Sequence, residues 1–269
     1  MQPERPLDCS SPSEAVLHEP GSPLLTVIIP VFNERATIDE LLRRVLAAPY
    51  DKQIIVVDDG STDGTSLVLD DWAKNGAVEL CRHHRNCGKG RSIRTALKSA
   101  RGRFAIVQDG DLETDPQDYV TLVEPLLDGR ADLVIGSRFG RDGHFDGRVD
   151  AFLRLGVSLL NFAVLLLYGQ RITDEACCYK VLPIDLLRSM NLQCERFEFC
   201  PEVVAKAGRM NLRIVEVPVR YCPRTTADGK KIRYRDGLIA LWCLWRLRRW
   251  KPGVERPIRS GATDHGANR

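Results

Sequence analysis

The sequence predicts an α/β protein with a doubly wound, mostly parallel sheet, and two observations carry this prediction. Short β-branched apolar runs alternate with amphipathic helical patterns through the first half of the chain, and several of these runs end in turns rich in Gly and Asp. Such alternation is typical of parallel sheets whose helices cover both faces. The polar turns are then expected side by side at the carboxyl edge of the sheet, where such sheets bind ligands.

The expected elements follow one another along the chain. The first strand is LLTVIIPVF (24–32), and the apolar face of the helix after it is formed by Ile38, Leu41, Leu42, Val45 and Leu46. A second unit begins with the strand QIIVV (53–57), and a third pairs the helix GRSIRTALKSA (90–100) with the strand RFAIVQDGD (103–111). Later elements are less regular: the strand ADLVIGSRF, the apolar helix LGVSLLNFAVLLLYG and the strand LRIVEVPVRY, at 131–139, 155–169 and 212–221.

Composition and patterning limit the class of protein. A chain of 269 residues suits one large α/β domain, which we place at 24–235, and a net charge of +3 does not by itself indicate nucleic-acid binding. The nine cysteines show no CxxC pair and no zinc-type spacing, so they predict reduced thiols. We expect residues 1–23 to form a disordered leader and 254–269 a disordered tail. Because no run reaches about 18 apolar residues, we expect no transmembrane helix.

The turn VQDGDLETDP (107–116) crowds carboxylates directly after an apolar strand. Such groups repel one another and lose solvation as they approach, so a dense acidic cluster spreads into water or gathers around a cation. Asp109 and Asp111 can both turn towards a divalent cation where the chain leaves the sheet, and the small Gly110 lets the backbone come close. Hard oxygen ligands select Mg²⁺ or Mn²⁺, which keep water or substrate phosphates in their remaining positions.

Two further turns contain residues that could bind a nucleotide or a phosphate, and each turn also has a purely structural alternative. In DDGSTDGT, Asp58 and Asp59 can accept hydrogen bonds from a nucleotide, or the stretch can be an ordinary β-to-α turn with Asp as the N-cap. CGKGRSIRTA lacks the spacing of a P-loop; its Lys89 can neutralise a phosphate beside a helix N-terminus, or the loop can simply cap the helix. His83 and His84, just before this loop, are expected at the surface. Asn33 in PVFNE can likewise cap the first helix.

The motifs together carry a resemblance. VIIPVFNE, VVDDGSTDGT, GKG, DGDLETDP, VIGSRF, TDEACCYK, FEFCPEVVAKA and EVPVRY occur in this order within roughly residues 25–250. This set resembles the inverting family 2 glycosyltransferases, in the branch that is similar to dolichol-phosphate mannose synthase and to bacterial polyprenyl-phosphate hexosyltransferases. The resemblance implies a Rossmann-like domain of the GT-A type that binds a nucleotide-diphosphate sugar with a divalent metal, Mg²⁺ or Mn²⁺.

The same resemblance implies roles for residues of this chain. The implied nucleotide-sugar site consists of Pro30, Asn33, Glu34, Asp58, Lys89, Asp109 and Gly110. The implied metal ligands are Asp109, Asp111 and Glu113. The residues implied to bind the acceptor phosphate or the diphosphate are Arg138, Arg224 and Lys230. The catalytic candidates are Asp111, Arg138 and Asp174.

The acceptor decides the mechanism. A phosphate monoester is already ionised at neutral pH, so it can attack the anomeric carbon while cationic groups stabilise the departing diphosphate. An alcohol acceptor would need a base, and Asp174 is the carboxylate expected to serve. We expect transfer of a hexose from a GDP- or UDP-sugar to polyprenyl (dolichyl or undecaprenyl) phosphate. The alternatives are a soluble or lipid alcohol acceptor in polysaccharide or specialised-metabolite synthesis, and a non-catalytic nucleotide-sugar-binding protein.

The segment 236–253 is expected to form an amphipathic helix with basic and aromatic residues. Tryptophans and arginines alternate in it at helical spacing: Trp242, Trp245, Arg246, Arg248, Arg249 and Trp250. This pattern suits anionic lipid headgroups above an apolar face, although a helix packed on the domain with a solvated basic edge is the alternative. We expect a cytoplasmic protein in peripheral contact with the cytoplasmic face of a membrane, without a nucleic-acid partner. No feature of the sequence supports a membrane-protein partner.

Overall fold

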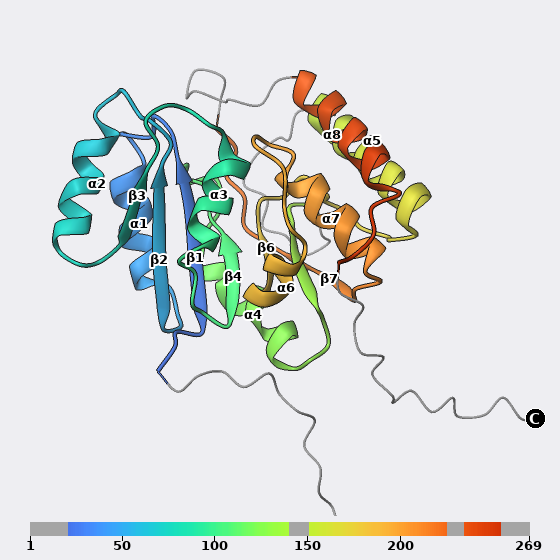
Figure 1. Ribbon diagram of the computed structural model, residues 1–269, viewed down its shortest axis with the longest axis horizontal. Helices are drawn as coiled ribbons and strands as arrows, with labels where there is room; N and C mark the ends of the chain where they lie inside the picture. Colours follow the sequence, from blue (N-terminus) through green and yellow to red (C-terminus); the bar gives the residue numbers. More distant parts are fainter. Residues whose placement is uncertain (1–20, 140–150, 225–233, 254–269) are drawn as a thin grey trace, which may run out of the picture.

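The computed structural model describes residues 21–139, 151–224 and 234–253 (Figure 1). Its centre is a seven-stranded sheet in the order β3-β2-β1-β4-β6-β5-β7. In chain order the strands are β1 (Leu25–Val31), β2 (Lys52–Asp58), β3 (Glu79–Arg82), β4 (Phe104–Val107), β5 (Leu133–Ser137), β6 (Lys180–Pro183) and β7 (Ile214–Pro218). β6 runs antiparallel to both of its neighbours, and the other strand pairings of the sheet are parallel. The predicted mostly parallel sheet is therefore confirmed.

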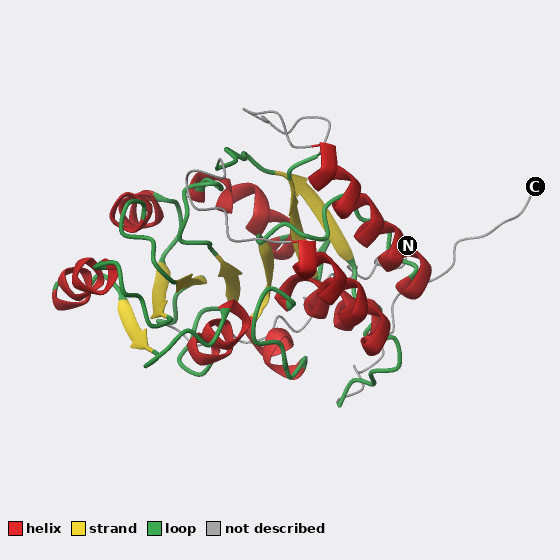
Figure 2. Cartoon of the chain, turned by 90° about the horizontal axis from the view of Figure 1, so that it is seen from above, coloured by secondary structure: helices red, strands yellow, loops and turns green. Residues whose placement is uncertain are grey.

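Helices cover both faces of this sheet (Figures 1 and 2). One face packs against α1 (Ile38–Ala47), α2 (Thr65–Lys74) and α4 (Tyr119–Leu127), the last preceded by the short 3-10 helix η1 (Pro116–Asp118). The other face packs against α3 (Lys89–Leu97), α5 (Ala151–Tyr168), α6 (Ile184–Ser189), α7 (Phe199–Arg209) and α8 (Tyr234–Leu247). Successive strand residues alternate between the two cores: Ile28 lies on the α3 side, and Val27 lies on the α1 side. Burial on both faces explains why the strand sequences are continuous apolar runs.

Several predicted elements differ from the observed ones in detail. α1 buries its predicted apolar residues except Leu46, which is 42% exposed, so the prediction for that residue was wrong. Asn33 does not cap α1, because the N-cap residue is Thr37. Asn33 instead adopts a positive φ of 52°, and its Oδ1 accepts a hydrogen bond from the N–H of Thr62 at 2.8 Å. β3 and β6 were not predicted.

The carboxyl ends of β1, β2, β4 and β5 lie along one edge of the sheet. The parallel register pairs Val31 of β1 with Asp58 of β2, and the N–H of Asp59 donates to the carbonyl of Val31 at 2.8 Å. The turns after β1 and β4 are joined where the Thr37 hydroxyl donates to the Gly110 carbonyl at 2.8 Å. Because β6 is reversed, its start lies at this edge, and the residues just before it lie there too.

The predicted helix at 236–253 is observed as α8, which packs against α5 and α7. Leu244 of α8 is fully buried, and its carbonyl accepts a hydrogen bond from the Tyr168 hydroxyl of α5 at 2.5 Å. Within the described residues, no helix has the length and apolar character needed to span a bilayer. The cysteines of this part of the chain are all free thiols.

Candidate active site

The turns after β1 and β2 join into one surface. The N–H of Asn33 donates to Ser61 Oγ at 3.0 Å. Asp58 is buried; its Oδ1 accepts from the N–H of Ser61 at 2.9 Å, and its Oδ2 accepts from the Ser66 hydroxyl at 2.5 Å. These bonds hold the turn after β2, but Asp58 does not cap α2 as the turn alternative expected, because the N-cap residue is Gly64. Contact of Asp58, Asn33 or Pro30 with a nucleoside stays a prediction.

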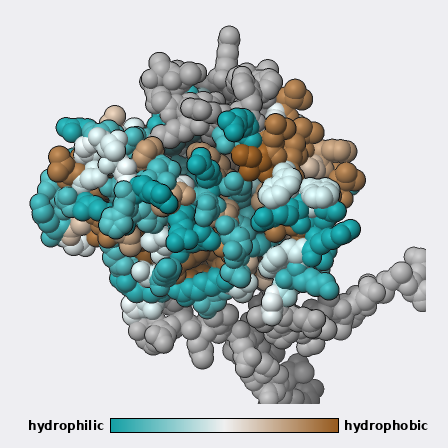
Figure 3. Space-filling view, turned by 45° about the horizontal axis from the view of Figure 1, so that its top comes forward, coloured by the Kyte–Doolittle hydropathy of each residue, from teal (hydrophilic) through white to brown (hydrophobic). Residues whose placement is uncertain are grey.

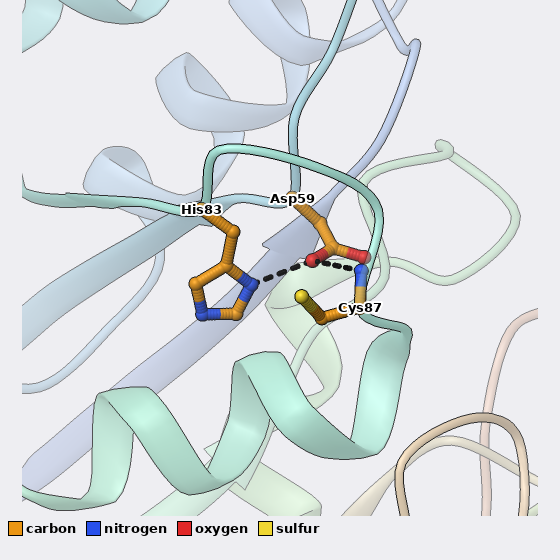
Figure 4. Close-up of side chains that lie close together, drawn as sticks. All are labelled: Asp59, His83 and Cys87. Carbon is orange, nitrogen blue, oxygen red and sulfur yellow. Dashed lines mark hydrogen bonds and ion pairs between the residues drawn. The ribbon is translucent and has the colours of Figure 1, made fainter.

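The neighbouring carboxylate, Asp59, holds the loop that leads into α3 (Figure 4). Its Oδ1 lies 2.6 Å from His83 Nδ1 and accepts from the N–H of Cys87 at 2.9 Å. Its Oδ2 accepts from the N–H of Gly88 at 2.7 Å. The second ring nitrogen of His83 lies 2.9 Å from the Thr95 hydroxyl, so the imidazole bridges Asp59 to α3. The sequence marked both Asp58 and Asp59 as possible nucleotide contacts, and it did not predict that Asp59 binds His83 and this loop.

The ligand atoms of Asp59, His83 and Cys87 lie within 4.8 Å of one another, the spacing of a possible metal site. All three residues are already hydrogen-bonded, since the thiol of Cys87 donates to the carbonyl of Arg85 at 3.3 Å. We therefore assign the trio a positioning role. The side chain of His83 is only 13% exposed, so its predicted surface position was wrong, whereas His84 is exposed as predicted.

Lys89 forms an ion pair with Asp109, which joins the start of α3 to the turn after β4. Burial lowers the pKa of Lys89, but the Asp109 carboxylate together with the neighbouring Cys178 and Cys200 raises it by more, so the net pKa lies above the ordinary value. The ammonium group is therefore charged at neutral pH. A cation at a helix start beside the acidic turn could neutralise a phosphate, and this role of Lys89 stays a prediction.

Arg224 contacts the other carboxylates of the site. Its guanidinium donates from Nη1 to Glu34 Oε2 at 2.9 Å and from Nη2 to Asp111 Oδ2 at 2.6 Å. Its backbone N–H donates to Glu113 Oε1 at 2.9 Å, and the Tyr221 hydroxyl donates to Glu113 Oε2 at 3.1 Å. Three distant parts of the chain therefore meet at the turn after β4: Glu34, Lys89 and the segment 221–224.

The carboxylates of this turn are ligands of the kind that a hard divalent cation prefers, although they do not surround such an ion on all sides. Burial, helped by the neighbouring carboxylates of Asp109 and Glu113, raises the pKa of Asp111 to about 7 against the effect of Arg224. Among the described residues, only the Asp59 trio has three ligand atoms within 4.8 Å of one another, so Asp109, Asp111 and Glu113 do not. Mg²⁺ is commonly held by one or two carboxylates together with substrate phosphates, and two carboxylates of this turn satisfy that requirement.

Arg138, at the end of β5, is held by Asp174. Its Nε donates to Asp174 Oδ2 at 2.7 Å, and its Nη2 donates to Asp174 Oδ1 at 2.8 Å. Its backbone N–H donates to Asp174 Oδ2 at 2.9 Å. Asp174 is fully buried, and the Arg138 guanidinium also lies 5.0 Å from the centre of the Tyr221 ring. Because both oxygens of Asp174 are occupied, a role for this residue as a base stays a prediction without support from its contacts.

The structure thus brings together most of the predicted residues at one edge of the sheet. A hollow of about 520 Å³ lies beside them, with Glu34, Leu112 and Arg224 in its lining, and this volume is in the range of small-molecule sites. Lys230 lies outside the described residues. Tyr221 was not among the residues selected from the sequence.

Glu175 is a further residue that the sequence prediction missed. Its side chain is 1% exposed, and neither carboxyl oxygen has a hydrogen-bond partner among the described residues. The nearby Lys180 donates instead to the backbone carbonyls of Glu175 and Cys177, at 2.8 and 2.6 Å. Burial raises the pKa of Glu175 to about 7 despite the opposing charges of Lys180 and Arg138. A buried acid in a run of eight mixed residues, TDEACCYK, carries no periodic signal that would reveal it.

We predict that Glu175→Gln stabilises the protein above pH 7 and that the gain shrinks as the pH falls. The folded-state pKa of about 7 lies above the unfolded value of roughly 4.3. The wild type therefore loses stability as the pH rises between these two values, up to about 3 kcal/mol, and the uncharged Gln removes that loss. Urea unfolding at pH 5 and pH 8 measures the effect, with the exposed Glu124→Gln as the control. An equal gain at both pH values would contradict the buried-acid interpretation.

The fold and the site define an α/β protein of the GT-A-like class. The fold is shared with glucosyl-3-phosphoglycerate synthase from Mycobacterium tuberculosis, solved in complex with Mn²⁺, UDP and glucosyl-3-phosphoglycerate. That comparison has a TM-score of 0.64 and 20% identity, and it covers 86% of this chain and 81% of the other. The sequence matches Glycosyl transferase family 2 over residues 26–188. The chain belongs to glycosyltransferase family 2, as its motifs suggested.

Two relatives show what this family includes. The chain is 30% identical to dodecaprenyl-phosphate galacturonate synthase of Rhizobium johnstonii over 67% of its own length and 54% of that protein's length. It therefore spans about half of that relative. It is 27% identical to UDP-N-acetylglucosamine–dolichyl-phosphate N-acetylglucosaminyltransferase of Methanococcus voltae, over 86% of this chain and 97% of the relative.

Proposed function

We propose that this glycosyltransferase is a metal-dependent, inverting hexosyltransferase that moves a sugar from a nucleotide diphosphate to polyprenyl phosphate. The observation that carries the proposal is the meeting of acidic and cationic groups at one edge of the sheet: Asp109 with Lys89, and Asp111 with Arg224. Relatives whose names include dodecaprenyl phosphate and dolichyl phosphate support the choice of acceptor.

The residues of the site suit the two anions of this reaction. Asp109 and Asp111 would hold a divalent cation, with Glu113 beside them, and that cation would stabilise charge on the leaving diphosphate. Lys89, at the start of α3, would bind the same diphosphate. Arg138 would hold the acceptor phosphate through guanidinium N–H groups other than the two that donate to Asp174. Lys230 is a further candidate for this phosphate.

The chemistry then needs no strong base. An ionised phosphate oxygen of the acceptor attacks the anomeric carbon, the bond from that carbon to the diphosphate oxygen breaks, and the configuration inverts. Asp174 is fully engaged by Arg138, which favours an acceptor that is already ionised over an alcohol that must lose a proton. The alcohol acceptor remains the second candidate function.

Incubation of the protein with Mn²⁺, labelled GDP- or UDP-sugars and polyprenyl phosphate in detergent or vesicles tests the proposal. We expect an organic-soluble, acid-labile labelled product. Labelling of added soluble alcohols alone would support the second candidate and overturn the phosphate acceptor. No transfer with any donor and acceptor, together with thermal stabilisation by a nucleotide sugar, would favour a non-catalytic binding protein.

A lipid acceptor requires access to a membrane surface, and α5 with α8 offers one. Hydrophobic residues gather over the side of the molecule where these two helices lie (Figure 3). The large apolar side chains exposed on them are Leu155, Leu159, Phe162, Leu165, Leu166, Leu238, Ile239, Trp242 and Trp245. Two arginines lie over the tryptophan rings: Arg246 is 4.9 Å from Trp242, and Arg248 is 3.8 Å from Trp245. Basic residues beside half-exposed indoles suit the interface of an anionic bilayer, so we propose peripheral contact with the cytoplasmic face.

We predict that the double variant Trp242→Ala/Trp245→Ala loses binding to vesicles that contain anionic lipid. Each indole is 55% exposed, and its burial in the interface is expected to contribute roughly 2 kcal/mol. The vesicle partition coefficient should therefore fall at least about tenfold in a co-sedimentation assay. Leu67→Ala is the matched control, because Leu67 is an exposed apolar residue of α2 on the opposite face of the sheet. Unchanged binding of the double variant would show that α8 is not the membrane contact.

A further inference from the structure

The Arg224 side chain occupies a central position among the carboxylates of the site. It bridges Glu34, from the turn after β1, and Asp111, from the turn after β4, at 2.9 and 2.6 Å. Its side chain is only 17% exposed. The oxygen of Asp111 that it contacts belongs to an expected metal ligand. A guanidinium and a divalent cation cannot both bind this oxygen closely, because their like charges would lie a few ångströms apart.

The fit of Arg224 among these carboxylates is incomplete. Its Nε is buried and has no hydrogen-bond partner among the described residues, and the nearest carboxylate oxygen, Glu113 Oε1, lies 3.9 Å away. A buried N–H without an acceptor costs free energy. A ligand whose oxygens accept hydrogen bonds from all of the guanidinium N–H groups, including Nε–H, would therefore stabilise this side chain. A diphosphate offers several oxygens with this geometry.

The backbone around Arg224 allows the side chain to move while its segment stays in place. The N–H of Cys222 donates to the carbonyl of Glu113 at 2.8 Å, and Tyr221 forms a β-bridge with Thr114. These contacts hold the segment against the acidic turn without using the guanidinium. A change of side-chain rotamer can therefore transfer the guanidinium from protein carboxylates to a bound ligand.

We propose that Arg224 couples cation binding to donor binding: its guanidinium holds Glu34 and Asp111 in the free enzyme and transfers to the donor's diphosphate when a divalent cation takes its place. The charges support this exchange. Glu34, Asp109, Asp111 and Glu113 bring four carboxylates, against two cations from Lys89 and Arg224. The four carboxylates exceed the two cations by two negative charges, so an anionic diphosphate alone would add to this excess, whereas a divalent cation bound with it offsets the excess.

This inference rests on the proposed function, and it makes a specific claim about affinities. A cation that binds alone must displace Arg224 without offering it a new anion, so its binding is weakened. When a nucleoside diphosphate binds together with the cation, the displaced Arg224 pairs with the diphosphate, so the cation does not lose affinity. The two ligands therefore bind cooperatively. Linkage requires that the nucleotide raises the affinity for the cation by the same factor as the cation raises the affinity for the nucleotide.

Titration of Mn²⁺, followed by the electron paramagnetic resonance signal of the free ion, tests the claim. Affinities are measured without nucleotide and with saturating GDP or UDP, for the wild type, Arg224→Gln and Arg220→Gln. We expect Arg224→Gln to bind Mn²⁺ alone about tenfold more tightly than the wild type and to lose most of the gain that the nucleotide confers. Arg220 lies on the same segment but pairs with Asp115 and Asp118, so Arg220→Gln should behave as the wild type.

Each other outcome has a defined meaning. If Arg224→Gln binds Mn²⁺ alone as weakly as the wild type, or keeps the full gain from the nucleotide, the coupling role is wrong even when the enzyme is active. If the wild type binds no Mn²⁺ with either nucleotide, the metal-dependent function itself fails. Should Arg224→Gln not fold, Arg224→Lys replaces it: the shorter ammonium lacks the fork that bridges Glu34 and Asp111, so the same loss of coupling is expected, and wild-type coupling in that variant overturns the proposal.

Discussion

Asp111→Asn is expected to abolish glycosyl transfer while the protein remains folded. Asp111 is the carboxylate that lies against Arg224 and between the charges of Asp109 and Glu113. An amide of the same size keeps the packing but lacks the charge that a divalent cation requires. Loss of charge stabilisation on the leaving diphosphate should lower kcat/KM by about 10²–10³-fold or more.

Steady-state transfer of labelled sugar to polyprenyl phosphate measures this loss, and circular dichroism checks the fold. Asp71→Asn is the control, since the Asp71 side chain is 78% exposed on α2 and forms an ion pair with Lys74. That variant should keep the wild-type rate. Full turnover of Asp111→Asn in the presence of a chelator would exclude a metal at this turn and, with it, most of the proposed site.

Asp174→Asn is expected to lower the free energy of unfolding by about 3–5 kcal/mol. The change removes the negative partner of Arg138, whose side chain is only 10% exposed, and leaves a buried guanidinium without a counter-charge. Urea unfolding monitored by tryptophan fluorescence measures the stability. Transfer should also fall, because Arg138 loses the contacts that orient it at the end of β5.

The exposed pair formed by Arg213 and Asp132 is the matched control for this prediction. Arg213 also donates to both oxygens of its partner, but its side chain is 49% exposed, so Asp132→Asn should cost no more than about 1 kcal/mol. The comparison also separates two roles of Asp174. A base would reveal itself as a large loss of kcat in Asp174→Asn with the stability unchanged, and that result would revive the alcohol acceptor.

The sequence predicted the fold well where burial produces a clear pattern. β1 and β2 are buried on both faces, so their sequences are uninterrupted apolar runs, and α1 has a regular apolar face. β3 was missed because this edge strand, ELCR, is only half buried and has no alternation. β6 was missed because it begins with the charged Lys180, which is fully buried through hydrogen bonds to two backbone carbonyls.

The site was predictable to the extent that it lies on strand ends. Asp109 and Asp111 were selected because parallel strands end at one edge of a sheet. Their partners could not be derived from spacing: Arg224 reaches Glu34 across 190 positions of the chain, and His83 reaches Asp59 across 24. The resemblance to a family supplied Arg224 as a phosphate ligand, but its bridge between two carboxylates depends on side-chain geometry that no motif encodes.

The antiparallel strand β6 sets the distance between the turn after β4 and the end of β5. It lies between β4 and β5, so the turn that carries Asp109 and the end that carries Arg138 are separated by two strand spacings, about 9.5 Å. Were these strands direct neighbours, the turn after β4 and the end of β5 would lie at half that distance, and the two anions proposed to bind there would repel each other more strongly. β6 thus acts as a spacer, and in the proposed reaction its width would leave room for one sugar ring between the two phosphate groups.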